Sequence, residues 1–293
     1  MSRKKMTSEP GDHGEPVVFP LLSVPGLDVM DVICHSGPDD QPFEEKNYYV
    51  SLAIVMEGTF KYRARRAPVL LSPGSLLLIS AEDNFECSHE HVCGDRCISF
   101  QYEPAYFERI AADLGACGNP HKFSQDRLPA LPPLIALSAE AQAGIAGPHV
   151  VDFEELALDL AATVLVELAE SRVSPRSTTT QDERRISTTL RLMEERFREP
   201  LTLESLATFN GLSPYHFLRI FKQVTGITPH QFLLRKRLRE AAQLLRTTNL
   251  SVLETALEAG FGDLSHFNHT FRAAFGTTPS KWRYMRFGKR YKG

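Results

Sequence analysis

Residues 202–229 read TLESLATFNGLSPYHFLRIFKQVTGITP, and this stretch predicts two short helices joined by a tight turn. Thr202 and Ser213 are of the residue type that caps helix N-termini, and Pro214 stands at the first helical position, where a missing backbone N–H costs nothing. Gly211 supplies the positive φ that ends the first helix and permits the turn. A helix, a glycine-containing turn and a second capped helix are typical of a helix-turn-helix unit.

The second predicted helix of this unit has one apolar face. Phe217, Ile220 and Phe221 recur at i, i+3 and i+4, so we expect them to point into a core. The remaining faces carry polar, basic or isolated apolar side chains: Tyr215, His216, Leu218, Arg219 and Lys222.

Residues 251–279, SVLETALEAGFGDLSHFNHTFRAAFGTTP, repeat the pattern. The run from Phe221 to Phe232 matches the run from Phe271 to Trp282 at an offset of 50, and Gly211 matches Gly260 at an offset of 49. A long helix from Pro229 is expected to hold the two units at a fixed separation. The expected inner face of the second unit is Phe267, Thr270, Phe271 and Phe275. The expected outward residues are Leu264, Ser265, Asn268 and His269, with Arg272 beside them.

The distribution of charge supports a nucleic-acid partner for this part of the chain. The whole protein has a formal net charge of −3, from 33 basic and 36 acidic residues. Of these, 19 basic and 10 acidic residues lie from Asp182 onward, which leaves 14 basic and 26 acidic residues before it. The positive charge is therefore concentrated in the helical half, as expected for a segment that contacts an acidic partner.

Two motifs carry a resemblance to a known family. The first is A-x5-S-x2-H-F-x-R-x-F-K-x3-G-x-T-P-x2-F, from Ala207 to Phe232. The second is G-F-x-D-x-S-x-F-x3-F-R-x3-G-x-T-P-x2-W, from Gly260 to Trp282. Together they resemble the DNA-binding domain of the AraC/XylS family of transcription regulators, over about a third of the chain. The resemblance implies two recognition helices that enter successive major-groove segments on one face of double-stranded DNA.

The same resemblance assigns roles to the outward side chains. It implies base-facing positions for Tyr215, Leu218 and Arg219 in the first unit, and for Leu264, Ser265, Asn268 and His269 in the second. Arg219 suits a bidentate contact to guanine and Asn268 suits adenine. Lys222, Arg272 and Lys281 are expected at phosphates, together with the helix N-termini.

The first half of the chain has a different pattern. Between about Val17 and Tyr102, short β-rich runs alternate with turns, which predicts a small antiparallel barrel or sandwich. This part loosely resembles the cupin-like sensor domain that is often joined to such DNA-binding domains. Helices are expected from Pro104 and from Phe153 to Glu170. The second of these either packs on its own domain or forms part of a homodimer interface.

These observations predict an α+β multidomain protein. We expect a disordered lead at residues 1–16 and a cupin-like β-barrel with flanking helices at 17–172. A linker at 173–182 then leads to an all-α domain with two helix-turn-helix subdomains at 183–293. No apolar run approaches the length of a membrane helix, and five cysteines without a secretion signal suit a cytoplasmic protein with reduced thiols.

One cluster in the predicted barrel suggests a metal site. Strand periodicity places Cys87, His89, His91 and Cys93 on one face, and Cys97 follows a Gly94-Asp95 turn. Imidazoles and thiols suit Zn²⁺, yet ligands spaced two residues apart along one strand lie about 6–7 Å from one another. Oxidant sensing by the thiols and simple structural packing remain alternatives.

The sequence therefore favours an effector-responsive, dimeric DNA-binding regulator and not an enzyme. As an activator it would contact RNA polymerase. Alternatives are a metal- or redox-sensing regulator that uses the Cys/His cluster, a metal-dependent cupin enzyme tethered to DNA, and an architectural DNA binder that needs no effector.

Overall fold

Short strands follow one another through the N-terminal half of the protein. The computed structural model describes residues 16–40, 42–89, 94–115, 119–146, 151–170 and 179–285. Its strands are β1 (Val17–Val24), β2 (Leu27–Cys34), β3 (Phe43–Lys46), β4 (Val50–Gly58), β5 (Phe60–Arg63), β6 (Val69–Leu71), β7 (Leu76–Ile79), β8 (Asn84–Ser88), β9 (Asp95–Tyr102) and β10 (Arg127–Leu128).

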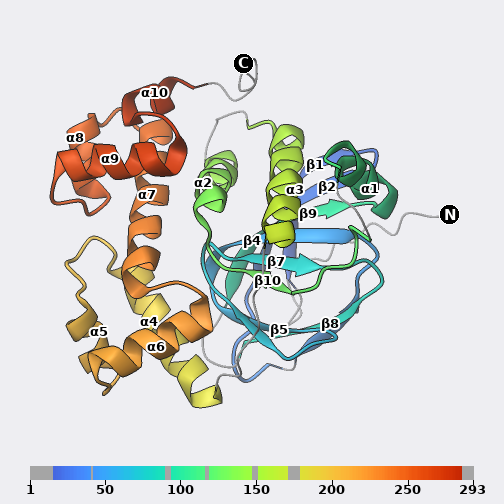
Figure 1. Cartoon of the computed structure of the whole chain (residues 1–293), viewed down its shortest axis with the longest axis horizontal. Helices are drawn as coiled ribbons and strands as arrows, with labels where there is room; N and C mark the ends of the chain where they lie inside the picture. Colours follow the sequence, from blue (N-terminus) through green and yellow to red (C-terminus); the bar gives the residue numbers. More distant parts are fainter. Residues whose placement is uncertain are drawn as a thin grey trace.

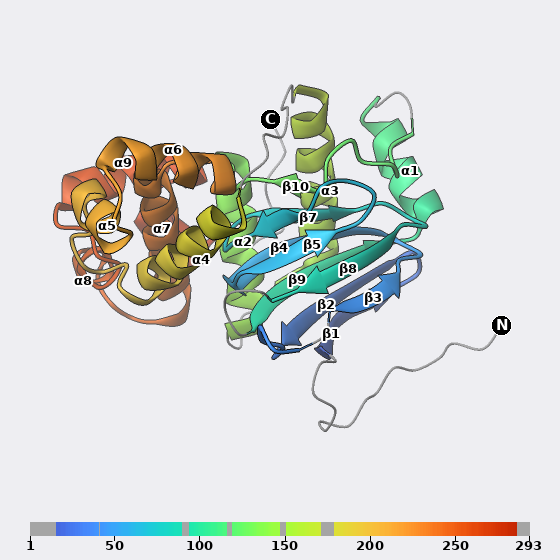
Figure 2. The ribbon, with the colours of Figure 1, turned by 90° about the horizontal axis from the view of Figure 1, so that it is seen from below.

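These strands form two antiparallel sheets, and in Figure 2 the smaller sheet lies in front of the larger one. Among the described residues, the larger sheet has the order β1-β2-β9-β4-β7-β10 and the smaller sheet the order β3-β8-β5-β6. At the centre of the larger sheet, β9 pairs with both β2 and β4, so that Phe100 stands opposite Val29 on one side and Leu52 on the other. All three side chains are completely buried.

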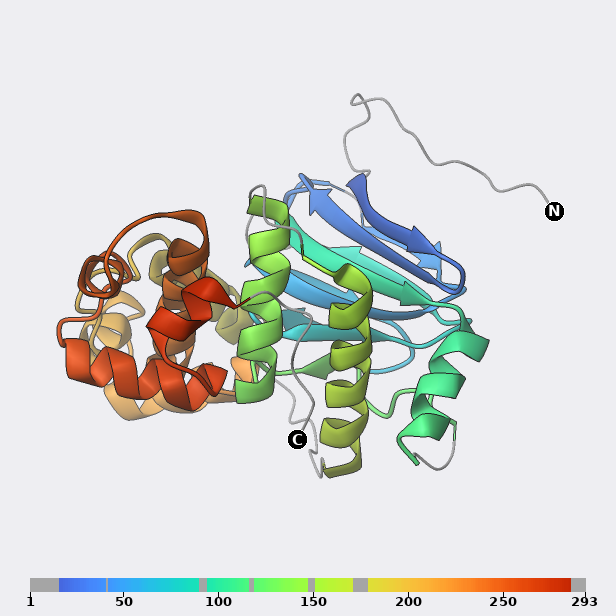
Figure 3. The same ribbon diagram turned by 90° about the horizontal axis from the view of Figure 1, so that it is seen from above.

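Three helices cover the outer face of the larger sheet: α1 (Pro104–Asp113), α2 (Pro132–Ala146) and α3 (Phe153–Glu170). Along β4, Leu52 and Ile54 point toward these helices, whereas Ala53 and Val55 point toward the smaller sheet, as the two-residue period of a strand requires. The result is three layers, of helices, large sheet and small sheet. Figure 3 shows α2 and α3 side by side over the sheet.

The predicted closure into a cupin-like barrel is not observed. One hydrogen-bonded ladder ends at β1 and β10 and the other at β3 and β6, and no ladder between described residues joins the two sheets. The chain crosses from β4 to β5 at Gly58, where φ is 75° and a Cβ would lie 2.2 Å from the carbonyl oxygen of Gly94. Alternation along a strand predicts two faces, but it does not determine whether the outermost strands meet.

The helices of this half are only partly those expected. The predicted helices beginning at Pro104 and Phe153 are observed as α1 and α3. The helix α2 lies in a segment that the sequence pattern did not mark as helical. Its residues Leu134, Ile135 and Ala139 are all buried, because α2 is enclosed by protein on more than one side.

The C-terminal half is helical throughout its described residues. Its helices are α4 (Thr180–Glu195), α5 (Leu203–Phe209), α6 (Pro214–Thr225), α7 (Pro229–Thr247), α8 (Val252–Glu258), α9 (Leu264–Phe275) and α10 (Pro279–Tyr284). The helix α4 begins inside the predicted linker, with Thr179 as its N-cap. The predicted N-terminal lead up to residue 15, and residues 171–178 of the interdomain region, lie outside the described residues.

Each copy of the sequence repeat has its own hydrophobic core. The first core gathers residues of α4, α5, α6 and the start of α7 around Phe217 and Phe221. The second gathers residues of α7, α8, α9 and α10 around Phe271 and Trp282. The long helix α7 belongs to both cores, and therefore joins the two units as the sequence predicts. No helix within the described residues is both long and apolar enough to cross a membrane.

The two halves of the protein are packed against each other, with α2 next to α7 and α9 (Figure 1). Ile135 and Ala139 of α2 belong to the core of the second unit, and Leu70 and Ala130 belong to the core of the first. The contact also contains an ion pair between Lys61 and Glu183, whose charged atoms are 3.0 Å apart. Both helix-turn-helix units are thus docked on the N-terminal domain.

The two turn glycines allow a matched test of the repeat. Gly211 and Gly260 have φ values of 63° and 83°, so alanine at either position costs about 1–2 kcal/mol of folding free energy. At Gly211 a Cβ meets nothing within 4 Å, whereas at Gly260 it would lie 2.8 Å from Cα of Arg198. We expect Gly260→Ala to lower the urea midpoint clearly more than Gly211→Ala. Equal midpoint shifts would contradict the close backbone approach.

Candidate nucleic-acid interface

Side chains of the first helix-turn-helix unit cap the N-termini of both of its helices. At the start of α5, Thr202 and Ser205 form a capping box, in which each side chain bonds the other residue's backbone N–H. The Ser213 hydroxyl accepts a hydrogen bond from the backbone N–H of His216 at 3.3 Å and caps α6. Gly226 ends α6 with φ 83°. The capped boundaries agree with the sequence prediction and fix which side chains α6 presents outward.

The outward residues of α6 are placed much as predicted. Phe217, Ile220 and Phe221 are buried, with at most 2% of their surface exposed. Arg219 and Lys222 are exposed, and His216 and Leu218 are half-buried. The backbone of Tyr215 belongs to α6, but its side chain lies outside the described residues. The helix therefore offers two free cationic groups at solvent.

The second unit repeats this arrangement. Ser251 and Glu254 form the capping box of α8, and the Asp263 carboxylate accepts from the backbone N–H of His266 at 2.5 Å to cap α9. The inner residues Phe267, Phe271 and Phe275 are buried, while Thr270 is only half-buried. The outward residues are all exposed: Leu264, Ser265, Asn268, His269 and Arg272.

Direct contacts hold the two units in one orientation. Nε of Arg198, in the segment after α4, donates to the carbonyl oxygen of Glu258 in the second unit at 2.8 Å. Nε of Arg237 on α7 donates to the carbonyl oxygen of Phe197 at 2.7 Å. With the close approach of Gly260 to Arg198, these bonds join the segment after α4 to α7 and to the end of α8.

Docking on the N-terminal domain leaves the outward faces of α6 and α9 free. The contacts from that domain reach the C-terminal end of α6, where Arg127 donates to the carbonyl oxygen of Val224 and Pro129 lies against Gly226. They do not cover Arg219 or Asn268, both of which are exposed. These two predicted DNA-contacting side chains are therefore accessible in the docked arrangement.

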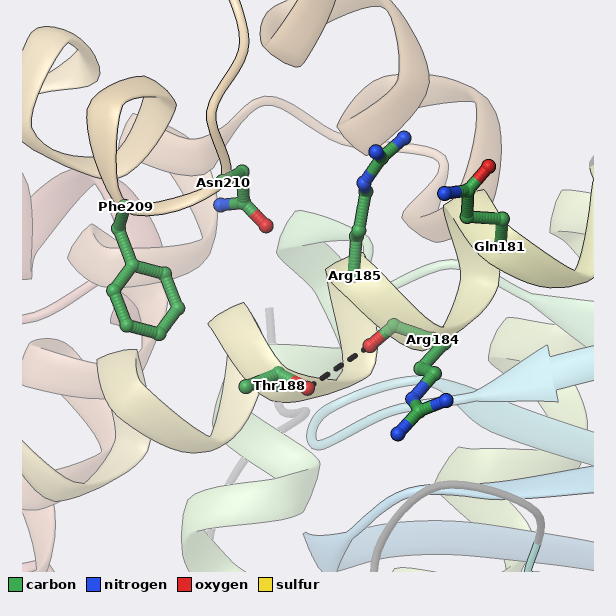
Figure 4. Close-up of a pocket in the computed structure, with 6 residues that line it drawn as sticks. All are labelled: Gln181, Arg184, Arg185, Thr188, Phe209 and Asn210. Carbon is green, nitrogen blue, oxygen red and sulfur yellow. Dashed lines mark hydrogen bonds between the residues drawn. The ribbon is translucent and has the colours of Figure 1, made fainter.

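A shallow groove lies between α4 and the end of α5, and Figure 4 shows its six lining residues. Arg184 and Arg185 of α4 line one side of it and Phe209, which is 52% exposed, lines the other. Thr188 donates to the carbonyl oxygen of Arg184 at 3.0 Å, so its hydroxyl is already engaged within α4. Leu218 and Arg219 of α6 do not line this groove.

The predicted Cys/His cluster is only partly assembled as expected. Cys87, His89 and Cys97 are buried between the two sheets. His91 and Cys93 lie outside the described residues. Two residues that the prediction missed complete a compact group with His89. They are Cys34, the last residue of β2, and Asp95, the first residue of β9, which stand directly opposite each other in the sheet. Spacing within one segment does not indicate them, because the pairing of β2 with β9 brings Cys34 to Asp95.

Hydrogen bonds within this group change the pKa values of its members. Burial alone lowers the pKa of His89, but hydrogen bonds to Asp95 and Cys34 outweigh it and raise the pKa to about 9. Burial alone raises the pKa of Cys34, but bonds from His89 and Ser36 outweigh it, so the pKa falls below its ordinary value. The pKa values of Cys87 and Cys97 are raised by burial. Among the described cysteines, Cys34 is thus the one whose thiolate is favoured.

The fold and the two exposed helices define a helix-turn-helix DNA-binding protein. Residues 206–285 match the protein family described as "Helix-turn-helix domain". The HTH-type transcriptional activator RhaS from Salmonella arizonae and from Salmonella typhimurium is 28% identical over 243 residues, which cover 80% of this chain and 85% of the relative. The chain belongs to the AraC/XylS family of transcriptional regulators.

Solved structures with similarity to this chain include two of different extent. The DNA-binding domain of AdpA, a global transcriptional factor solved with a target DNA, is 31% identical, with a TM-score of 0.33 over 33% of this chain and 88% of that chain. ToxT from Vibrio cholerae, solved with an unsaturated fatty acid, is 12% identical, with a TM-score of 0.38 over 91% of this chain and 98% of that chain.

Proposed function

We propose that this regulator reads two successive major-groove segments of double-stranded DNA, with α6 in one and α9 in the next. Arg219 makes a bidentate contact to guanine and Asn268 to adenine, while Ser265 and His269 contribute further polar contacts. Lys222, Arg272 and Lys281 neutralise phosphates, and Leu218 and Leu264 contact thymine methyl groups or carry no specificity. The observation that carries this proposal is the pair of capped helices, α6 and α9, with exposed polar residues on their outward faces.

The N-terminal domain is proposed to make DNA binding respond to an effector. It contacts both helix-turn-helix units through α2 and Arg127, so any ligand that prefers one docked arrangement shifts the orientation of both units. The name of the relative RhaS, a transcriptional activator, supports activation through RNA polymerase.

A homodimer is proposed through α3. Its side chains Leu158 and Val166 are exposed by 38% and 53%, and they lie eight residues apart on one face of the helix. Exposed apolar side chains at this spacing suit the same helix of a second copy. The dimer would place two DNA-binding domains on neighbouring sites.

Replacement of Arg219 by alanine tests the base-reading role. The preferred DNA sequence is first selected from a randomised pool with the wild-type protein. We expect Arg219→Ala to weaken binding to that sequence by about 1–3 kcal/mol, or about 5- to 150-fold, and to relax the preference at one base pair. A fluorescence titration against a panel of single-base variants gives both quantities.

Lys222→Ala is the matched control on the same helix. It is expected to weaken all sequences about equally and to reduce the salt dependence of binding, since it removes a phosphate contact. If Arg219→Ala also weakened every sequence equally, Arg219 would be a phosphate contact and the proposed guanine contact would be wrong.

A further inference from the structure

The group formed by Cys34, His89 and Asp95 has the composition of a metal site. One donor atom from each residue, a thiol sulfur, a ring nitrogen and a carboxylate oxygen, lies within 4.8 Å of both others. Nε2 of His89 is 2.5 Å from Oδ1 of Asp95. In tetrahedral zinc sites such donors lie about 3.3–3.7 Å apart, given Zn–S bonds of about 2.3 Å and Zn–N and Zn–O bonds of about 2.0–2.2 Å. Small side-chain movements therefore suffice to surround one ion.

The position of the group in the fold is unusual for polar side chains. Cys34 and Asp95 point into the space between the two sheets, beside the apolar cluster that contains Val55 and Phe60. The side chains of His89 and Asp95 are exposed by only 2% and 8%. Buried carboxylates and imidazoles are stabilised by pairing, as in the contact between His89 and Asp95, or by binding a metal. A bound cation would stabilise the carboxylate and the thiolate together.

A second thiol lies within reach of the group. Sγ of Cys97 is 3.4 Å from Oδ2 of Asp95 and comes from the same face of β9. Two sulfurs, one nitrogen and one oxygen form a donor set for a borderline-soft cation such as Zn²⁺, because Mg²⁺ and Ca²⁺ prefer ligands that are all oxygen.

We propose that Cys34, His89 and Asp95 bind a zinc ion between the two sheets of the N-terminal domain. The ion joins β2 and β9 of the larger sheet to the segment that follows β8 of the smaller sheet. It thus links the sheets at an end where no hydrogen-bonded ladder between described residues does so. The site is independent of the DNA-reading role of α6 and α9.

Titration with Co²⁺, followed by displacement with Zn²⁺, tests this site in the full-length protein after dialysis against a chelator. We expect about one ion per chain, with the visible absorption of tetrahedral Co²⁺ and the near-ultraviolet band of a thiolate ligand. Zn²⁺ should raise the melting temperature, because it binds the folded state. Absence of the thiolate band in the wild-type protein would overturn the proposal.

Cys34→Ser and His89→Gln are the informative variants, and circular dichroism without metal shows whether each is folded. Both should lose more than about 100-fold in affinity and should no longer be stabilised by Zn²⁺. His121→Gln is the control, because His121 also pairs with a carboxylate, that of Glu108 at 2.9 Å, but outside this group. It should bind as the wild type does.

Cys34→Ser keeps the test decisive if His89→Gln fails to fold, because the serine variant replaces only the sulfur atom by oxygen. Undiminished binding by folded Cys34→Ser refutes the site. The site is also refuted if the wild-type protein binds no metal and peroxide modifies Cys34 alone. That result would assign the group to thiol oxidation.

Discussion

Replacement of Trp282 by alanine is expected to destabilise the second helix-turn-helix unit by about 3–5 kcal/mol. Trp282 is 1% exposed, and its ring lies 4.6 Å from that of Phe275 and 6.0 Å from that of Phe271. Its Nε1–H donates to the carbonyl oxygen of Ala242 on α7 at 3.2 Å. Alanine leaves a cavity where α7, α9 and α10 meet, so α9 loses the support that orients Asn268.

Trp282→Phe separates the loss of volume from the loss of the hydrogen bond. The repeat itself suggests this control, because Phe232 occupies the equivalent position in the first unit and packs on Phe221 with ring centroids 6.2 Å apart. The phenylalanine variant should lose only about 1–2 kcal/mol, from the missing N–H and the smaller ring. Thermal unfolding measures the loss of stability in each variant, and amide hydrogen exchange measures the loss of protection in α9. Equal losses in the two variants would show that the ring's volume is not what supports α9.

The helical half could be predicted from sequence in some detail, because its signals are local. A capping side chain or a glycine at positive φ acts on the residues next to it, so Ser213 and Gly211 mark the boundaries of α6 within one turn. The apolar spacing of Phe217 and Phe221 likewise determines which face of α6 is buried. The same capping residues, turn glycine and apolar spacing occur in both units, so each unit supports the prediction made for the other.

The features that the sequence does not predict are α2, the pairing of Cys34 with Asp95 and the open sheets. They depend on contacts between residues far apart in the sequence. The helix α2 carries apolar residues on several sides, because it faces α3 in one domain and α7 in the other, and so it has no amphipathic pattern. The pairing of Cys34 with Asp95 joins residues of β2 and β9 that lie far apart along the chain. Closure of the sheets depends on strand pairing at their edges, which no single strand encodes.

One partly buried cation, Arg127, bonds both domains at their contact, and its removal is expected to loosen the docking. The guanidinium of Arg127 donates to the carbonyl oxygen of Leu70 in the N-terminal domain at 2.7 Å and to that of Val224 at the end of α6. Burial lowers the pKa of Arg127 to about 10, which leaves it charged at neutral pH. A cation at a helix C-terminus is also favoured by the helix dipole.

Arg127→Met keeps the unbranched stem but removes every donor, and should weaken the docking by about 1.5–3 kcal/mol. We expect faster amide hydrogen exchange at the end of α6 and along the α2–α7 contact. The control is Arg66→Met, because Arg66 bonds Asp126 at 2.6 Å and Phe123 at 2.7 Å, both within the N-terminal domain. Arg66→Met should leave exchange in α6 unchanged. Unchanged exchange in Arg127→Met as well would mean that the apolar contacts of Leu70, Ile135 and Ala139 hold the domains together without the cation.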